Sequence, residues 1–223
     1  MTDIIELLIL IFILVILWRI GSFLTKRTLM LVRIYGLKKA CNANISLQSF
    51  PYRPMWMAGK KPDIRVEILD TVYLVRIYSG GGIGRSLHFA NECYSASYIS
   101  TAGGMPRRRT GNPRSQSPLT SGLNIGARVT YTAPLDRTDG AARGKKIVPV
   151  LLLNPAPGSL SYVTEQKTSI QVAFTGDDMY GIKVFTASTF AIFADRMKRE
   201  EERLKAEMAA SGHPEFEYFD NFK

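Results

Sequence analysis

Cysteine and histidine are scarce in this sequence, and their scarcity excludes two kinds of site. The only cysteines are Cys41 and Cys93, and the only histidines are His88 and His213. Two cysteines cannot form a disulfide framework, and they cannot complete a zinc site without other ligands. Two histidines likewise exclude a histidine-rich metal centre. We therefore expect the protein to work without a cofactor.

Acidic residues are also in the minority. The 223 residues include 19 aspartates and glutamates against 29 lysines and arginines, which gives a net charge of +10. Any large partner surface should therefore be anionic. The hydrophobic fraction of 46% and the charged fraction of 22% are close to the average for globular proteins. These values exclude a wholly disordered chain and a multi-span transporter, and the length suits one domain with an anchor.

The longest hydrophobic run lies near the N-terminus. Leu7 to Leu17 are eleven consecutive leucine, isoleucine, phenylalanine or valine residues, and apolar character extends from Ile4 to Leu24. As a helix, the longer stretch would measure about 30 Å, one hydrocarbon thickness of a bilayer. Transfer of the run into a bilayer is favourable by about 4 to 6 kcal/mol. The sequence therefore predicts a transmembrane anchor over residues 1–24.

Two other kinds of helix have a similar hydrophobic run. A cleavable signal peptide begins with basic residues, whereas Met1–Glu6 carries Asp3 and Glu6 and no lysine or arginine. A helix buried in a protein core is the second alternative, because eleven apolar residues in a row also occur in large cores. We favour the single membrane span over both.

Basic residues follow the hydrophobic run with no acidic residue among them. They are Arg19, Lys26, Arg27, Arg33, Lys38 and Lys39. The positive-inside rule then predicts a single-pass plasma-membrane protein with its N-terminus outside and its C-terminal domain in the cytoplasm. Two free cysteines suit that reducing compartment. The basic residues either fix this topology alone or also bind anionic lipid headgroups.

Composition divides the rest of the chain into three segments. They are a basic juxtamembrane collar with a linker (residues 25–61), an α+β cytoplasmic domain (62–210) with a flexible basic insertion (101–146), and an acidic, aromatic tail (211–223). A loop as long as the insertion is usually functional or disordered.

The cytoplasmic domain shows first strand and then helix patterns. Ile64, Val66 and Ile68 alternate with more polar residues, which is typical of a half-buried strand, and the apolar run Val148–Leu153 is typical of a central strand. Helical spacing of apolar residues begins after Thr186, and either Ser188 or Thr186 can cap this helix. The sequence predicts an antiparallel β-sheet with a C-terminal helix across one face.

Several short motifs resemble a known group of proteins. Leu151–Pro155 is followed by Gly176–Asp177 with Gly181, and Lys61–Asp63 precedes the first strand. Together with the N-terminal hydrophobic helix, this order resembles uncharacterised single-pass bacterial membrane proteins with a small α+β cytoplasmic domain. The resemblance implies the architecture. That group has no assigned activity, so the resemblance implies no function.

The basic insertion is the strongest candidate for binding. It holds nine basic residues against Asp136 and Asp139. An arginine-rich segment among glycine, proline and asparagine can follow a phosphate backbone or a headgroup layer without fixed geometry. It lacks interleaved aromatic residues, so stacking on bases is not indicated. A solvated loop is the alternative. The residues expected to bind anionic lipid or nucleic acid are Arg107, Arg108, Arg109, Arg114, Lys145 and Lys146.

Four carboxylates suggest a metal-dependent nuclease as a rival function. Asp63 and Glu67 fall on one face of the first strand, and Asp177 and Asp178 could add ligands for a divalent ion. Ile68 and Leu69 follow Glu67, so the catalytic lysine expected two positions later is missing. Solvated side chains and turn formers are the simpler interpretation of these residues.

Two further motifs offer weaker chemistry. Gly80–Ser86 has the glycines of a phosphate-binding loop, but Ser79 stands where the first glycine is needed and Arg85 replaces the lysine. A flexible hairpin tip explains it better. Cys93 and His88 could pair as nucleophile and base, but their relative orientation does not follow from the sequence.

The sequence as a whole contains no convergent catalytic set. We therefore expect a tethered adaptor or binding protein rather than an enzyme. Its partners would be the lipid bilayer, anionic lipid or nucleic acid at the basic insertion, and a protein bound by the C-terminal helix and tail. The alternative is a membrane-bound metal-dependent hydrolase.

Overall fold

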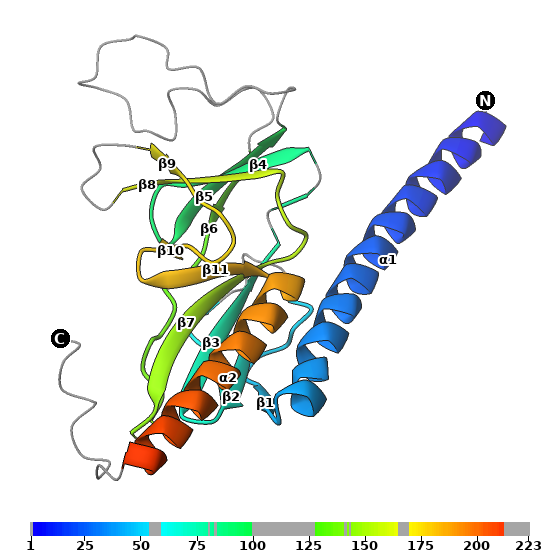
Figure 1. The fold of residues 1–223 in the computed structure, drawn as a ribbon. Helices are drawn as coiled ribbons and strands as arrows, with labels where there is room; N and C mark the ends of the chain where they lie inside the picture. The colour runs from blue at the N-terminus through cyan, green and yellow to red at the C-terminus, as the bar shows by residue number, and fades with distance from the viewer. Residues whose placement is uncertain are drawn as a thin grey trace, which may run out of the picture.

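A computed structural model of the protein contains two helices and two β-sheets in the described part of the chain (Figure 1). The described residues are 2–53, 59–79, 81–82, 84–99, 128–140, 142, 144–164 and 170–211. An α+β fold with a long apolar N-terminal helix and a C-terminal helix was predicted, and the structure confirms it.

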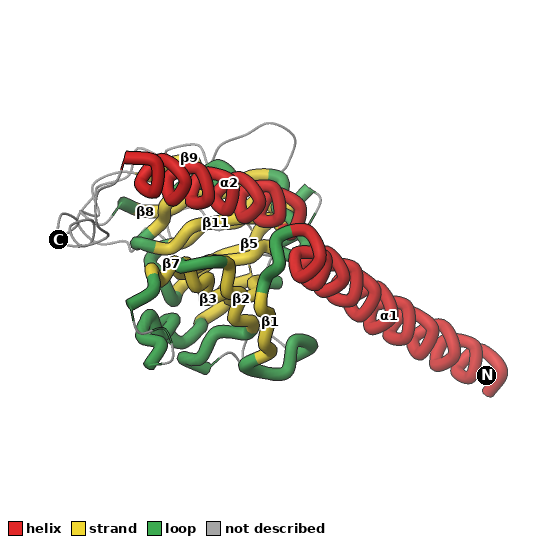
Figure 2. Tube along the Cα trace, turned by 60° about the horizontal axis from the view of Figure 1, so that its bottom comes forward, coloured by secondary structure: helices red, strands yellow, loops and turns green. Residues whose placement is uncertain are grey.

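Helix α1 (Thr2–Ala40) is continuous over 39 residues and has two different halves. Over 39 residues a helix is about 58 Å long. From Ile4 to Ile20 every side chain is exposed, and this half projects away from the domain (Figure 2). In the second half, Met30, Ile34 and Leu37 are buried at spacings of four and three residues. One helix therefore carries both the exposed apolar segment and part of the domain core.

The larger sheet has six strands in the order β1-β2-β3-β7-β11-β10. The bounds are β1 (Asn44–Leu47), β2 (Ile64–Ile68), β3 (Thr71–Tyr78), β7 (Lys146–Leu153), β10 (Asp178–Met179) and β11 (Ile182–Thr186). Strand β7 pairs in parallel with both β3 and β11, and the other pairs are antiparallel. The apolar run predicted as a central strand is indeed central. Strand β1 lies in the segment that composition indicated as a linker.

The smaller sheet has five strands in the order β6-β5-β4-β8-β9. The bounds are β4 (Arg85–Phe89), β5 (Tyr94–Ile99), β6 (Arg128–Tyr131), β8 (Ser159–Val163) and β9 (Ile170–Val172). Strands β4 and β8 are parallel. The prediction of one antiparallel sheet is therefore wrong, because the chain forms two mixed sheets. Alternation of apolar residues identifies a strand but does not identify its neighbour, and the parallel neighbours are far apart in the sequence.

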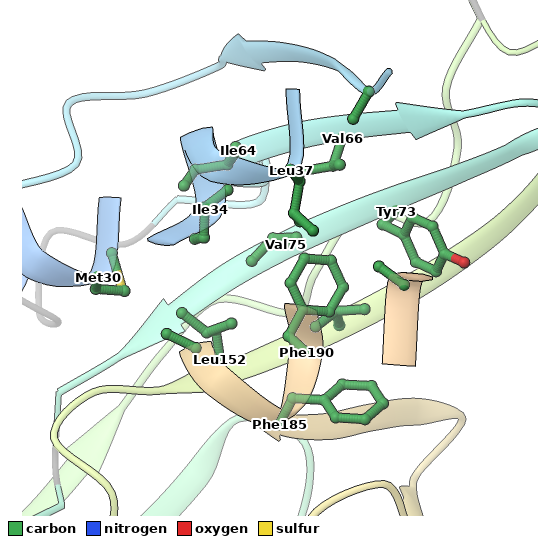
Figure 3. Close-up of a cluster of buried hydrophobic side chains, with 14 of the residues drawn as sticks. Met30, Ile34, Leu37, Ile64, Val66, Tyr73, Val75, Leu152, Phe185 and Phe190 are labelled. Carbon is green, nitrogen blue, oxygen red and sulfur yellow. The ribbon is translucent and has the colours of Figure 1, made fainter. Parts of the chain in front are cut away.

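Helices α1 and α2 (Ala187–Ser211) cover one face of the larger sheet (Figure 3). Tyr73 and Val75 of β3 contact this layer, and the Tyr73 ring meets Phe190 of α2 edge-on with 5.6 Å between centroids. A second core, which includes Tyr78 and Phe89, brings side chains of both sheets together. The predicted cap of α2 is confirmed, since Thr186 Oγ1 accepts a hydrogen bond from the Thr189 amide at 3.3 Å.

The burial pattern of α1 predicts how two substitutions on this helix will differ. We expect Ile34→Ala to lower the free energy of unfolding by about 2 to 5 kcal/mol, because it leaves a cavity between α1 and the sheet. Val32→Ala is the control, because Val32 is exposed on the same helix, and we expect it to change stability by less than about 0.5 kcal/mol. Urea denaturation of the full chain in detergent micelles measures both. Equal losses would contradict the observed docking of α1.

Candidate functional site

Some residues expected to bind an anionic surface lie outside the described residues. They are Arg107, Arg108, Arg109 and Arg114, and the tail beyond Ser211 lies outside them too. The candidate set also includes two lysines that the structure describes. Lys145 binds Glu67 through its Nζ atom, and Lys146 is exposed at the start of β7.

The basic residues of α1 fall into two groups. Five of them are exposed on the helix surface, namely Arg19, Lys26, Arg33, Lys38 and Lys39. Arg27 differs, because only 2% of its surface is exposed. It precedes Met30 by three residues and belongs to the same buried stripe of the helix. Arg27 is the first buried position along α1 and marks the point where this helix joins the domain.

The guanidinium of Arg27 has few partners for a buried charged group. Its Nη2 atom donates a hydrogen bond to the hydroxyl of Ser79, the residue after β3. Its Cζ atom lies 5.4 Å from the centroid of the Phe23 ring, one turn earlier on α1. The Nε and Nη1 atoms are shielded from water and have no hydrogen-bond partner among the described residues. Two donors of this arginine are therefore unsatisfied.

Asp63, one of the predicted metal ligands, is the buried carboxylate of this region. Its Oδ1 atom accepts hydrogen bonds from Ser49 Oγ at 2.7 Å and from Arg53 Nε at 3.0 Å. Its Oδ2 atom accepts a hydrogen bond from the Ile77 amide at 2.8 Å. Both oxygens are thus used within the domain, where they tie the segment before β2 to the end of β3.

The ends of β3 and β7 also contact α1 through polar groups. Asn154, which follows β7, donates from Nδ2 to the carbonyl of Lys26 at 3.1 Å. The loops after the two strands approach closely, since a Cβ atom at Gly81 would clash with the carbonyl oxygen of Pro155. Only glycine fits there without a shift of the backbone. The carboxyl edge of these parallel strands therefore meets α1 at Arg27.

A second charged cluster lies on strand β2, on the opposite face of the larger sheet. Arg65 Nε is 2.6 Å from Asp139 Oδ2, and Arg65 Nη1 is 2.7 Å from Glu67 Oε2. Hydrogen bonds from Lys145 and then from Arg65 lower the pKa of Glu67. The bond to Asp139 raises the pKa of Arg65. A groove of about 380 Å³ adjoins this cluster and is lined by residues such as Lys61, Arg65 and Asp136.

The structure does not bring the four predicted metal ligands together. Glu67 lies in β2, whereas Asp178 lies in β10 and Asp177 directly precedes it. Three strands stand between β2 and β10, which is about 19 Å at the usual strand spacing. Asp177 instead accepts a hydrogen bond from the Phe174 amide. Among the described residues, no group of three or more His, Cys, Asp or Glu side chains could hold a metal ion.

His88 has a different partner from the one considered in the sequence. Its Nδ1 atom is 2.9 Å from the hydroxyl of Ser161, which is its direct neighbour on the parallel strand β8. Burial lowers the pKa of His88, so its imidazole is neutral at pH 7. Cys93 lies in the connection between β4 and β5, where its amide binds the side chain of Asn91. Sequence reasoning missed Ser161 because the β4–β8 pairing was not predicted.

The ion pairs of Glu67 predict a pH dependence of stability. A carboxylate whose pKa is lowered by folding stabilises the fold fully above its ordinary pKa of 4.5, and this contribution is lost as the pH falls below that value. We expect Glu67→Gln to lower the melting temperature at pH 7 and to flatten its fall between about pH 5 and pH 3. Glu207→Gln is the control, because Glu207 is exposed on α2. An unchanged acid slope in Glu67→Gln would contradict this role.

No protein-family model matches the chain, and neither a curated protein nor a solved structure matches it. The candidate site at Arg27 therefore rests on the geometry of the chain itself.

Proposed function

We propose that this protein is a membrane-tethered binding protein whose domain is held against the surface of the bilayer. The observation that carries the proposal is the continuity of α1. Its first half exposes apolar side chains, and its second half is part of the domain core. No hinge separates the two halves, because the helix is unbroken from Thr2 to Ala40.

The exposure of the first half supports a membrane span over a core helix. None of the most apolar part of α1 is buried against the rest of the described chain, and Trp18 is 79% exposed. A contiguous apolar surface of this length is unfavourable in water and favourable in lipid. A signal peptide has the same apolar character. Against it stands the unbroken passage of the helix from the apolar half into the core.

The short distance between the apolar segment and the domain supports a position of the domain at the membrane surface. Arg27 follows Leu24 by three residues, which is about 4.5 Å along the helix axis. Lys26 would therefore lie among the headgroups. Lys38 and Lys39 would stand about 21 Å or more from Leu24 along the axis, beyond the range of surface electrostatics at physiological salt. The more distant basic residues therefore act mainly on topology.

The other partners follow from charge. The basic side of the apolar segment faces the cytoplasm under the positive-inside rule, so the domain is proposed to be cytoplasmic. The basic insertion would contact anionic lipid or nucleic acid. The last turns of α2 offer a charged, exposed surface with helical ion pairs such as Glu200–Arg203 at 3.1 Å, and this surface is proposed to bind a protein.

Charges placed in the middle of the apolar half test the tether. Each arginine at the centre of a span opposes insertion by about 2.5 to 3.5 kcal/mol, so two would cancel the favourable transfer of the run. We expect the double variant Leu10→Arg and Leu14→Arg to move from the membrane pellet to the aqueous fraction. The domain should stay folded, because both side chains are exposed. Leu10→Ala with Leu14→Ala should stay in the pellet. A wild-type chain found in the aqueous fraction would refute the proposal.

The proposed topology predicts which end of the chain is accessible from outside. We expect a peptide tag after Lys223 to resist protease added to intact cells and to be digested once the membrane is permeabilised. A tag before Thr2 should be digested in intact cells, which serves as the matched control. Immunoblotting of the two tags measures the outcome. Digestion of the C-terminal tag in intact cells would show that the domain lies outside.

A further inference from the structure

Arg27 is a buried cation whose hydrogen-bonding capacity is mostly unused. Only 2% of its surface is exposed, yet Nε and Nη1 have no hydrogen-bond partner in the part of the chain that the structure describes. A buried donor that lacks an acceptor is unfavourable, and more so when it carries charge. Within the described chain, its Nη2 atom donates to Ser79 Oγ. The described chain therefore provides no hydrogen-bond acceptor for these two nitrogen atoms.

The neighbouring carboxylate does not supply that acceptor. Arg53 binds Asp63 with 2.7 Å between Nη2 and Oδ1, and the other bonds of Asp63 go to Ser49 and to the Ile77 amide. The region thus contains the guanidinium groups of Arg27 and Arg53 and the buried carboxylate of Asp63, and the buried guanidinium of Arg76 is close enough to interact with the same carboxylate. An excess of positive charge remains at the place where α1 joins the domain, and it favours an anionic ligand.

The direction of the Arg27 side chain brings the guanidinium toward the apolar segment. Side chains on a helix lean toward its N-terminus, and the Arg27 guanidinium accordingly lies over the Phe23 ring. Phe23 is one residue before the end of the apolar stretch. With that stretch in a bilayer, the guanidinium lies at the boundary between the hydrocarbon and the headgroups, next to the layer of lipid phosphates. Ser79, at the carboxyl end of β3, is beside it, and such strand ends often form ligand sites.

We propose that Arg27 and Ser79 form a binding site for the phosphate group of an anionic lipid. The proposal rests on the proposed membrane tether, which sets the depth of Arg27. An arginine is suited to a phosphate because several N–H groups of one planar cation can donate to its oxygens. Nε and Nη1 are shielded, so the phosphate reaches them only after a neighbouring side chain moves. Free phosphate has the same chemistry and is distinguished by experiment.

The experiment measures the melting temperature of the full chain in neutral detergent micelles. The micelles contain added phosphatidylglycerol, inorganic phosphate, or sodium chloride at equal ionic strength. Near saturation we expect phosphatidylglycerol to raise the melting temperature by about 5 °C. A rise with phosphatidylglycerol but not with inorganic phosphate identifies the lipid as the ligand. A rise with inorganic phosphate alone, or an equal rise with sodium chloride, overturns the lipid proposal.

Two matched variants show whether the effect belongs to Arg27. Arg27→Gln should lose the rise in melting temperature, whereas Lys26→Gln should keep it. Lys26 carries the same charge at the preceding position, where its side chain is exposed. Arg27→Met provides a second variant in case the amide perturbs folding, because its apolar side chain suits a buried site. A full rise in a folded Arg27 variant overturns the proposal. Arg27→Gln should remain in the membrane pellet, so loss of this site is distinguishable from loss of the tether.

Discussion

The architecture depends on one helix that has to satisfy two environments. The hydrogen bonds of α1 run without interruption from Thr2 to Ala40, so its two halves cannot be oriented independently. The first half presents apolar side chains on every side, whereas the second buries the stripe formed by Arg27, Met30, Ile34 and Leu37. A strand or a flexible linker after Leu24 would have let the domain turn freely. The helix instead fixes the direction in which the apolar half leaves the domain.

The two sheets explain why the carboxyl edge of β3 and β7 is where α1 joins the domain. One face of the larger sheet is covered by α1 and α2, and side chains from the other face pack with those of the smaller sheet. With both faces covered, polar groups of the loops meet the helix at the strand ends. Ser79 and Asn154 occupy these positions and bind groups of α1. Arg27 is buried there because it is the first residue of the stripe of α1 that packs on the sheet, one turn before Met30.

Local patterns in the sequence predicted local structure well. The alternation at Ile64, Val66 and Ile68 gives strand β2, the apolar run before Asn154 gives the central strand, and Thr186 caps α2. Pairing between distant segments could not be predicted in this way. Thr71 of β3 is opposite Lys146 of β7, which follows it by 75 residues, and no periodicity identifies that partner.

In the candidate site too, local features could be predicted from the sequence, whereas contacts between distant segments could not. The carboxylates at Asp63 and Asp177 were grouped by residue type, but the order of strands separates them. Arg27 carried a signal that was available, because it continues the spacing of Met30, Ile34 and Leu37 toward the N-terminus. An arginine at a core position of a helix is uncommon, so this spacing alone could have indicated Arg27 as a candidate site residue. Its unpaired donors follow only from three-dimensional contacts.

Because the helix is unbroken, the number of residues between the apolar half and the domain determines how the domain is rotated about the helix axis. Each residue of an α-helix turns the chain by about 100°, so one residue added between Leu24 and Arg27 would swing the domain by that angle about the helix axis. Seven added residues would restore nearly the original azimuth while moving the domain about 10 Å farther along the axis. The number of residues in this short stretch thus sets the direction in which every surface of the domain faces around the helix axis.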